Sequence, residues 1–208
     1  MSTSRSENTT PHAPGPQPVW EIATLYPPQG MWTEVGYLAL TNSISRLIEF
    51  TDGKVEFLPM PTKSHQVLLM ALLDALRVFV QRDNKGMALP APLRVRIRPD
   101  KFREPDIVFM SSANLHRAGD DYFEGADLVM EIVSSDPESR KRDLEEKPRD
   151  YAEALIPEYW IVDPQERCIH ICSEPSESGY AKTNLVLEDD VASSVVLPGF
   201  SIRWNELL

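Results

Sequence analysis

Two short apolar stretches, each carrying one candidate acid, decide the fold of this chain: REPDIVFM at residues 103–110 and DLVMEIVS at residues 127–134. Both have the length of a strand and are rich in Val, Ile and Phe, which predicts two buried strands of an α/β sheet. A carboxylate in such a strand is costly unless it is paired or bound to a metal. Asp106 and Glu131 on neighbouring strands therefore indicate a cation site.

Each of these acids also has a simpler explanation. Asp106 follows a proline and could cap a turn, and Glu131 could form a structural salt bridge. Metal ligation is favoured for the pair, because Mg²⁺ takes oxygen ligands from one or two carboxylates and leaves its other positions to water and phosphate. Alternation along the second stretch places Glu131 on the same face as Val129 and Val133.

A helix with a third group of polar residues is predicted between the second stretch and the apolar run YWIVDP at residues 159–164. Within it Asp143, Lys147 and Tyr151 are spaced by four residues and share one helix face. Tyr151 is expected to belong mainly to the core.

Further elements are predicted outward from these stretches. Strands that alternate with helices predict a mixed central sheet with flanking helices and a terminal antiparallel meander. An Asp-Gly turn at Asp52 and Gly53 predicts a hairpin, and Thr62 or Ser64 is expected to cap the main core helix. The expected helices are 33–40, the segment from 62 or 64 to near 86, and 139–154; the expected strands are 46–50, 54–58, 93–97, 105–110, 128–133, 158–162, 168–172, 181–187 and 195–202.

Length and composition predict one domain. The chain has 208 residues with 42% hydrophobic side chains, enough for one substantial core. Residues 1–19 are rich in Ser, Thr and Pro and are expected to form a disordered leader, with a single domain over residues 20–208. No segment approaches the roughly 20 apolar residues that cross a bilayer, so no membrane contact is expected. Cys168 and Cys172 would lie about 13 Å apart on one strand, beyond disulfide reach, which favours a reducing cytoplasm.

The net charge of −11 argues against a generally basic nucleic-acid surface, because phosphate affinity comes largely from Lys and Arg. A local basic strip could still coexist with the acidic total. Alternatively, the alternating arginines before Asp106 could form only the solvated face of a strand. The residues of the candidate strip are Arg94, Arg96, Arg98, Lys101, Arg103, Arg140, Lys141, Arg142 and Lys147.

The order of these motifs resembles the Uma-type restriction endonucleases, a bacterial branch of the PD-(D/E)XK nuclease superfamily. The resemblance covers roughly residues 31–203. It is carried by EPD at 104–106, by DLVMEIVS at 127–134, by Asp143 with Lys147 and Tyr151, by PEYWIVDP at 157–164, and by EFTDGKV at 49–55 and PTKSHQ at 61–66. It implies a restriction-endonuclease-like fold and a Mg²⁺- or Mn²⁺-dependent DNA endonuclease.

The chain departs from the superfamily pattern at Val133, where the superfamily usually places a lysine. Either the active site is incomplete, or Lys147 supplies the ammonium from the following helix, as is usual in families that resemble this one. Lys147 could instead belong to a surface helix pair. Pro148 adds a difficulty, because the residue before a proline is disfavoured in helical geometry.

Glu49 and His65 match positions of the family and are expected to complete the catalytic set with Asp106, Glu131 and Lys147. Glu49 could alternatively be an exposed strand residue, and His65 a satisfied imidazole at a helix start. The resulting prediction is a cytoplasmic nuclease acting on DNA as a homodimer, because cutting both strands takes two active centres. The alternative is a degenerate nuclease fold that serves as an interaction or regulatory module.

Overall fold

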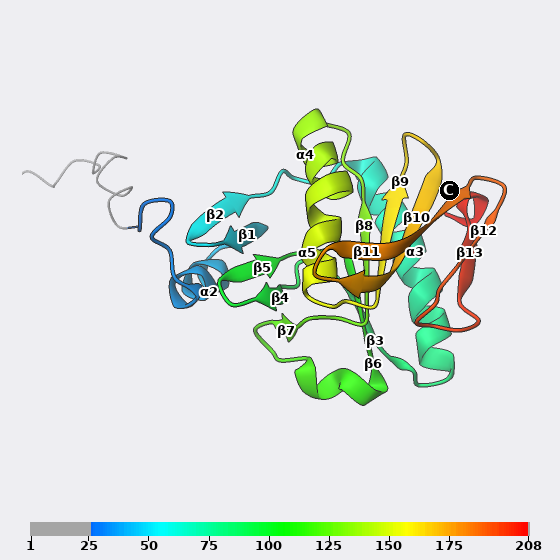
Figure 1. The fold of residues 1–208 in the computed structure, drawn as a ribbon, viewed down its shortest axis with the longest axis horizontal. Helices are drawn as coiled ribbons and strands as arrows, with labels where there is room; N and C mark the ends of the chain where they lie inside the picture. The colour runs from blue at the N-terminus through cyan, green and yellow to red at the C-terminus, as the bar shows by residue number, and fades with distance from the viewer. Residues whose placement is uncertain (1–25, 208) are drawn as a thin grey trace, which may run out of the picture.

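A mixed six-stranded sheet forms the centre of the computed structural model, which describes residues 26–207; the leader expected over residues 1–19 lies outside these (Figure 1). Strands β8 and β9 run parallel, because a helical crossover joins them, and the other neighbours are antiparallel. The strand order is β11-β10-β9-β8-β6-β3. The bounds are β3 (Gly86–Pro90), β6 (Ile107–Ser111), β8 (Leu128–Ile132), β9 (Glu158–Asp163), β10 (Cys168–Ser176) and β11 (Gly179–Leu187).

A second sheet has the order β2-β1-β5-β4-β7. The predicted hairpin is confirmed: Asp52 and Gly53 have φ angles of 47° and 79°, as a tight turn between β1 and β2 requires. The sequence did not predict β5 and β7 of this sheet or β3 of the central sheet. All three strands are short and carry no clear alternation. The strands of this sheet are β1 (Ile48–Thr51), β2 (Lys54–Phe57), β4 (Val95–Arg98), β5 (Lys101–Arg103) and β7 (Phe123–Glu124).

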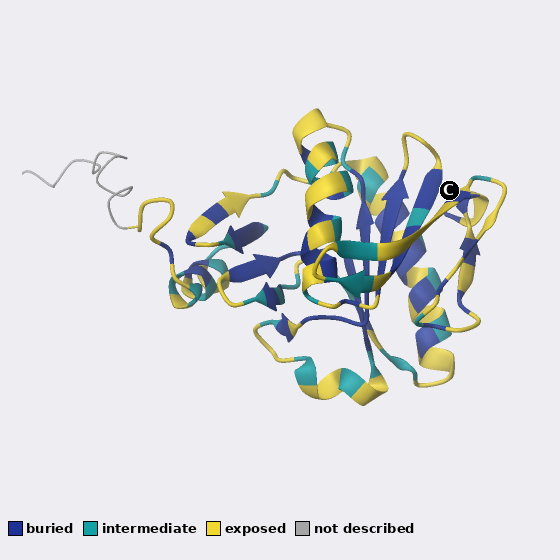
Figure 2. Ribbon diagram, viewed as in Figure 1, coloured by how far each residue is buried: buried dark blue, intermediate teal, exposed yellow. Residues whose placement is uncertain are grey.

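Helices cover both faces of the central sheet. The long helix α3 (Lys63–Arg82) packs against Leu128, Met130 and Ile132, whereas the opposite face packs against the helical segment that contains Tyr151. Figure 2 shows the strands β6, β8 and β9 buried between these layers. The capping predictions are confirmed: Thr62 accepts a hydrogen bond from the His65 N–H, and Thr33 caps α2 (Glu34–Ser43). Short 3₁₀ helices are η1 (Ser112–Arg117) and η3 (Trp204–Glu206).

The helix predicted over residues 139–154 is a nearly continuous run with a wide turn in the middle. It consists of α4 (Pro137–Lys141), a π-helical turn η2 (Arg142–Glu146) and α5 (Lys147–Glu153). The Lys147 N–H donates to the Arg142 carbonyl five residues back, and Lys147 keeps helical dihedrals of −58° and −40°. Pro148 in the first turn of α5 therefore does not interrupt the run.

The carboxyl-terminal meander differs in part from the prediction. β10 and β11 pair as expected, but residues 195–202 are not one strand: most form a loop before β13 (Ser201–Arg203), which pairs with β12 (Val191–Ser193). The buried Glu158 carboxylate holds this loop by accepting hydrogen bonds from the Val195 and Val196 N–H groups at 2.8 and 2.6 Å. Within residues 26–207, no helix has both the length and the apolar character to cross a membrane.

Candidate active site

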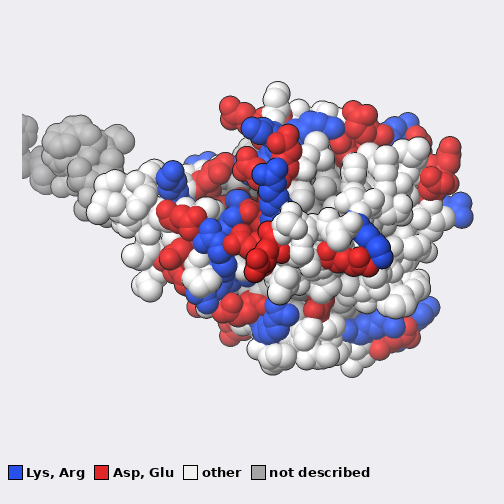
Figure 3. Space-filling model, in the orientation of Figure 1, with Lys and Arg blue, Asp and Glu red and all other residues white. Residues whose placement is uncertain are grey.

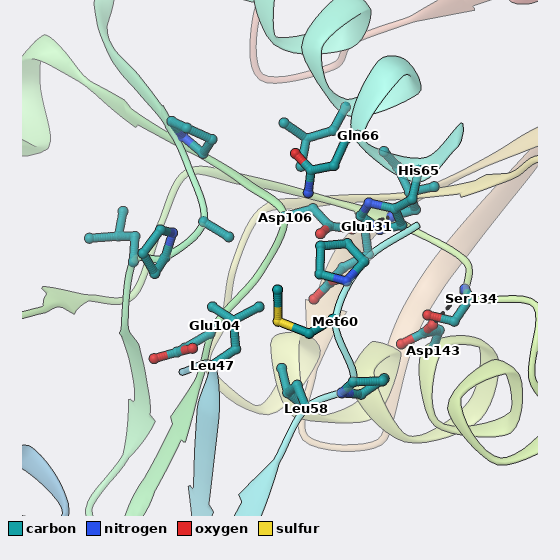
Figure 4. A pocket seen from close by; sticks show the side chains of 18 of the residues that line it. Leu47, Leu58, Met60, His65, Gln66, Glu104, Asp106, Glu131, Ser134 and Asp143 are labelled. Carbon is teal, nitrogen blue, oxygen red and sulfur yellow. Dashed lines mark hydrogen bonds and ion pairs between the residues drawn. The ribbon is translucent and has the colours of Figure 1, made fainter. Parts of the chain in front are cut away.

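A cleft of about 880 Å³ opens where the start of α3 meets the ends of β6 and β8 (Figure 4). Asp106 directly precedes β6, and Glu131 lies near the end of β8. Because Ile107 pairs with Met130 in an antiparallel register, the chain brings the two acids together on adjacent strands. His65, Asp143 and Lys147 also line this cleft. The structure thus assembles four of the five predicted catalytic residues.

Glu131 is almost completely buried in the cleft, with 3% of its side chain exposed. One carboxylate oxygen accepts a hydrogen bond from the Tyr151 hydroxyl at 2.6 Å, and the other lies 2.9 Å from Lys147 Nζ. Burial raises the pKa of Glu131 to about 7; the negative charges of Asp106 and Asp143 add to this rise, and Lys147 opposes it. Glu131 is thus held between the Tyr151 hydroxyl and the Lys147 ammonium.

Lys147 is buried rather than on the surface, which excludes the surface helix pair. Its ammonium lies 2.9 Å from both Glu131 Oε2 and Asp143 Oδ1, and 5% of the side chain is exposed. Burial alone would lower the pKa of Lys147, but the attraction of Glu131 and Asp143 outweighs it and raises the pKa. The Lys147 side chain therefore points toward the buried acid of β8.

Asp106 is fixed by the backbone and by His65. One oxygen, Oδ2, accepts the Ile132 N–H at 2.8 Å and lies 3.2 Å from His65 Nε2. Among the described residues, Oδ1 of Asp106 has no hydrogen-bond partner. Burial lowers the pKa of His65, but the hydrogen bond to Asp106 and the surrounding carboxylates raise it above its ordinary value. The buried Nδ1 atom of His65 has no partner in the described chain.

Glu49 requires a correction, because its carboxylate does not line the cleft. It is also not an exposed strand residue: 1% of its side chain is exposed, and it pairs with Arg103. Arg103 in turn contacts Asp150 on α5, which also binds Lys101. Burial would raise the pKa of Glu49, but Arg103 and then Lys147 lower it below its ordinary range. Glu49 thus belongs to a buried ion network behind the site.

Asp143 and Tyr151 contact the site directly, although the predicted catalytic set omits both. Asp143 Oδ2 accepts the Ser134 N–H at 3.1 Å while Oδ1 meets Lys147, and Tyr151 holds Glu131. The sequence signal that could have identified them is their spacing, four residues before and four residues after Lys147. In an α-helix, side chains four residues apart are displaced slightly around the helix axis. The π-helical turn holds more residues per turn, so it reduces this displacement and helps to align the three side chains.

The family model "Uma2: Putative restriction endonuclease" matches residues 32–205. The chain belongs to this family. A crystal structure from Anabaena variabilis ATCC 29413, described as a putative nuclease belonging to DUF820, superimposes with a TM-score of 0.66 and 16% sequence identity, covering 82% of this chain and 96% of that one. This likeness shows that the two chains share a fold. No curated protein matches the chain.

The predicted basic strip is largely neutralised in this Uma2-family chain. Arg96 pairs with Glu34 at 3.0 Å, and Arg98 pairs with Asp52 at 2.8 Å. Further along, Arg140 pairs with Asp163 at 2.6 Å. Figure 3 shows acidic and basic side chains interspersed on the visible face. The strip is therefore neither a free phosphate-binding surface nor a merely solvated face, because these arginines tie elements together.

The donor set of the cleft fits a divalent cation bound mainly by water and phosphate. Within residues 26–207, no three His, Cys, Asp or Glu side chains are placed to hold a metal together. Mg²⁺ does not require such a cage, since one or two carboxylates suffice. Asp106 has one unused oxygen, and both oxygens of Glu131 retain a second lone pair beside their contacts with Lys147 and Tyr151.

Proposed function

We propose that this chain is a Mg²⁺-dependent DNA endonuclease, able to use Mn²⁺, that hydrolyses phosphodiester bonds in the cleft. The observation that supports this most strongly is the buried ammonium of Lys147 in contact with Glu131, in the same cleft as Asp106. A lysine from the helix thereby takes the place of the one missing at Val133. Family membership and fold agree with this proposal.

Asp106 and Glu131 would hold the cation, which when bound polarises the phosphate and lowers the pKa of a water molecule. The chain prepares these ligands by fixing them. The Ile132 N–H orients Asp106, and the Tyr151 hydroxyl orients Glu131. Preorganised ligands need no rearrangement when charge develops on the phosphate.

Lys147 stabilises the developing negative charge or orients the attacking water. Its position is held by Asp143 on one side and Glu131 on the other, so it stays protonated. An ammonium in a desolvated cleft acts more strongly on a phosphate than it would in water. His65, bound to Asp106, serves as a proton carrier at the edge of the cleft.

A plasmid assay tests the proposed activity. Purified protein incubated with supercoiled DNA and Mg²⁺ or Mn²⁺ should convert it to nicked or linear forms, and the Asp106→Ala variant should not. The competing function, an interaction module, is favoured by the ion-paired arginines and the net charge of −11. Wild-type protein that binds the metal but leaves every DNA form intact would support that module instead.

Metal binding gives a prediction that does not depend on cleavage. The Asp106→Ala, Glu131→Ala double variant should lose Mn²⁺ binding in calorimetry, because it removes both proposed ligands. In the wild type, saturating Mn²⁺ should raise the melting temperature, since the metal binds the native site and hardly the unfolded chain. The matched control is Asp74→Ala, an exposed acid on α3 outside the cleft. Equal Mn²⁺ affinity in wild type and double variant would exclude these ligands.

Assembly is the next prediction. We propose a homodimer, because a two-fold pair supplies one active centre for each strand of a duplex. Light scattering combined with size-exclusion chromatography at micromolar concentration should give twice the chain mass of 23.5 kDa. A mass of one chain across that range would contradict the prediction.

A further inference from the structure

The cleft extends well beyond the acids and Lys147. Its volume of about 880 Å³ falls within the roughly 300–1,000 Å³ that small-molecule sites occupy. Figure 4 shows Leu47, Leu58 and Glu104 across the cleft from Ser134 and Asp143, with Met60 between them. This second half of the cleft has a largely apolar wall, to which Ile44, Pro59, Pro61, Pro90, Pro92 and Leu93 also contribute.

A buried carboxylate, that of Glu104, interrupts the apolar wall. Glu104 is 6% exposed, and its Oε2 atom accepts the Ile48 N–H at 3.1 Å. In the part of the chain that the structure describes, its Oε1 atom has no hydrogen-bond partner, and the residue lines the cleft. A buried acceptor in a largely apolar pocket favours ligands that present an N–H group at the edge of an otherwise apolar body.

Two arginines lie beside this half of the cleft and line it. The exposed Arg46 packs its guanidinium 4.7 Å from the centre of the Phe57 ring, and it makes no ion pair with a described residue. Arg94 donates to Thr41 Oγ1 at 2.6 Å and approaches an acid, Asp121, no closer than 4.0 Å. Arg46, and Arg94 of the candidate strip, are therefore held less tightly by carboxylates than Arg96 and Arg98, and they can meet a phosphate.

We propose that this half of the cleft holds one unpaired nucleobase, so that the preferred substrate is single-stranded or locally unwound DNA. The inference rests on the proposed nuclease function. A nucleobase has two apolar faces and at least one N–H donor on its edge, and its phosphates would reach Arg46 and Arg94. In a duplex that edge is paired and the base is stacked, and extrusion costs energy that a single strand does not pay. The net charge of −11 also disfavours long contact with a duplex backbone.

Binding of a labelled 20-nucleotide single strand, and of the same strand annealed to its complement, tests this inference by fluorescence anisotropy in Ca²⁺. We expect the single strand to bind at least about 10-fold more tightly. Met60→Asp, which places a negative charge in the pocket at a side chain that is 80% exposed, should remove most of that preference. The matched control is Met31→Asp, 68% exposed and outside the cleft, which should bind as wild type does.

A second variant tests the hydrogen bond. Glu104→Gln keeps the shape and can still accept the Ile48 N–H, but it gives the pocket an N–H donor. It should change the order of affinities among single-stranded homopolymers while leaving Mn²⁺ affinity unchanged, a pattern that a purely structural role would not produce.

The outcomes separate this inference from the proposed function. The nucleobase pocket would be overturned if duplex bound as tightly as single strand, or if Met60→Asp bound DNA as Met31→Asp does. If plasmid cleavage still depended on Asp106, the nuclease proposal would stand. Absence of both binding and cleavage for every DNA form would overturn both.

Discussion

Replacing Lys147 by Met lowers DNA cleavage by about 10²-fold or more, on the scale seen when one preorganised electrostatic stabiliser is removed. Such a loss corresponds to about 2.7 kcal/mol of transition-state stabilisation. Methionine keeps most of the length and apolar character of the stem, so the packing of α5 survives. What disappears is the ammonium that lies 2.9 Å from Glu131 Oε2.

The fold and Mn²⁺ binding of the Lys147→Met variant should persist. Removing the ammonium leaves Glu131 and Asp143 without their shared cation, but bound Mn²⁺ offsets their charge. The measurement is therefore single-turnover cleavage at saturating Mn²⁺, with circular dichroism to verify the fold and calorimetry to verify metal binding.

Lys141→Met is the matched control for this experiment. Lys141 lies on the same helical run, is exposed, and makes no ion pair with a residue that the structure describes. The Lys141→Met variant should cleave DNA as the wild type does. A Lys147→Met protein that cuts at the wild-type rate would remove Lys147 from the mechanism. It would leave a strand arginine as the candidate, or Lys141 if the Lys141→Met variant loses cleavage. Absence of cleavage by wild type and variant alike would favour the interaction module.

Replacing Arg103 by Met destabilises the fold by about 3–5 kcal/mol, the usual cost of breaking a buried ion pair from one side. The guanidinium lies between Glu49 on β1 and Asp150 on α5, and its side chain is 8% exposed. Its loss leaves Glu49 without its main partner in a dry environment. Thermal denaturation should show the melting temperature falling by roughly 6–20 °C for a domain of this size.

Two comparisons sharpen this result. Arg98→Met removes a more exposed guanidinium, 31% accessible, from pairs at the surface and should cost no more than about 1 kcal/mol. The Glu49→Gln, Arg103→Met double variant removes both charges and leaves the Lys101–Asp150 pair intact, so it should recover part of the loss. A double variant less stable than the sum of the two single changes would show that the network acts through something other than charge balance.

Local patterns determined the elements that carry the chemistry. The apolar stretches around Asp106 and Glu131 are β6 and β8, and the strand period put Glu131 on the face of Val129 and Val133. The Thr33 and Thr62 caps and the Asp-Gly hairpin were equally readable, because each depends on neighbours within a few residues. These signals do not require knowledge of the rest of the chain.

The tertiary structure alone decided what each charged side chain meets. Glu49 and Arg103 are 54 residues apart, and Arg103 and Asp150 are 47 apart, yet they share one buried network. Arg96 and Arg98 looked like a basic strip along one strand, but their partners come from α2 and from the β1–β2 turn. Periodicity places a side chain on a face of its own element, whereas its partner depends on which distant element packs there. For this reason the sequence alone was enough to predict the strands at Asp106 and Glu131 and the helix that carries Lys147. Only the tertiary structure shows that Glu49 belongs to the buried ion network and not to the cleft.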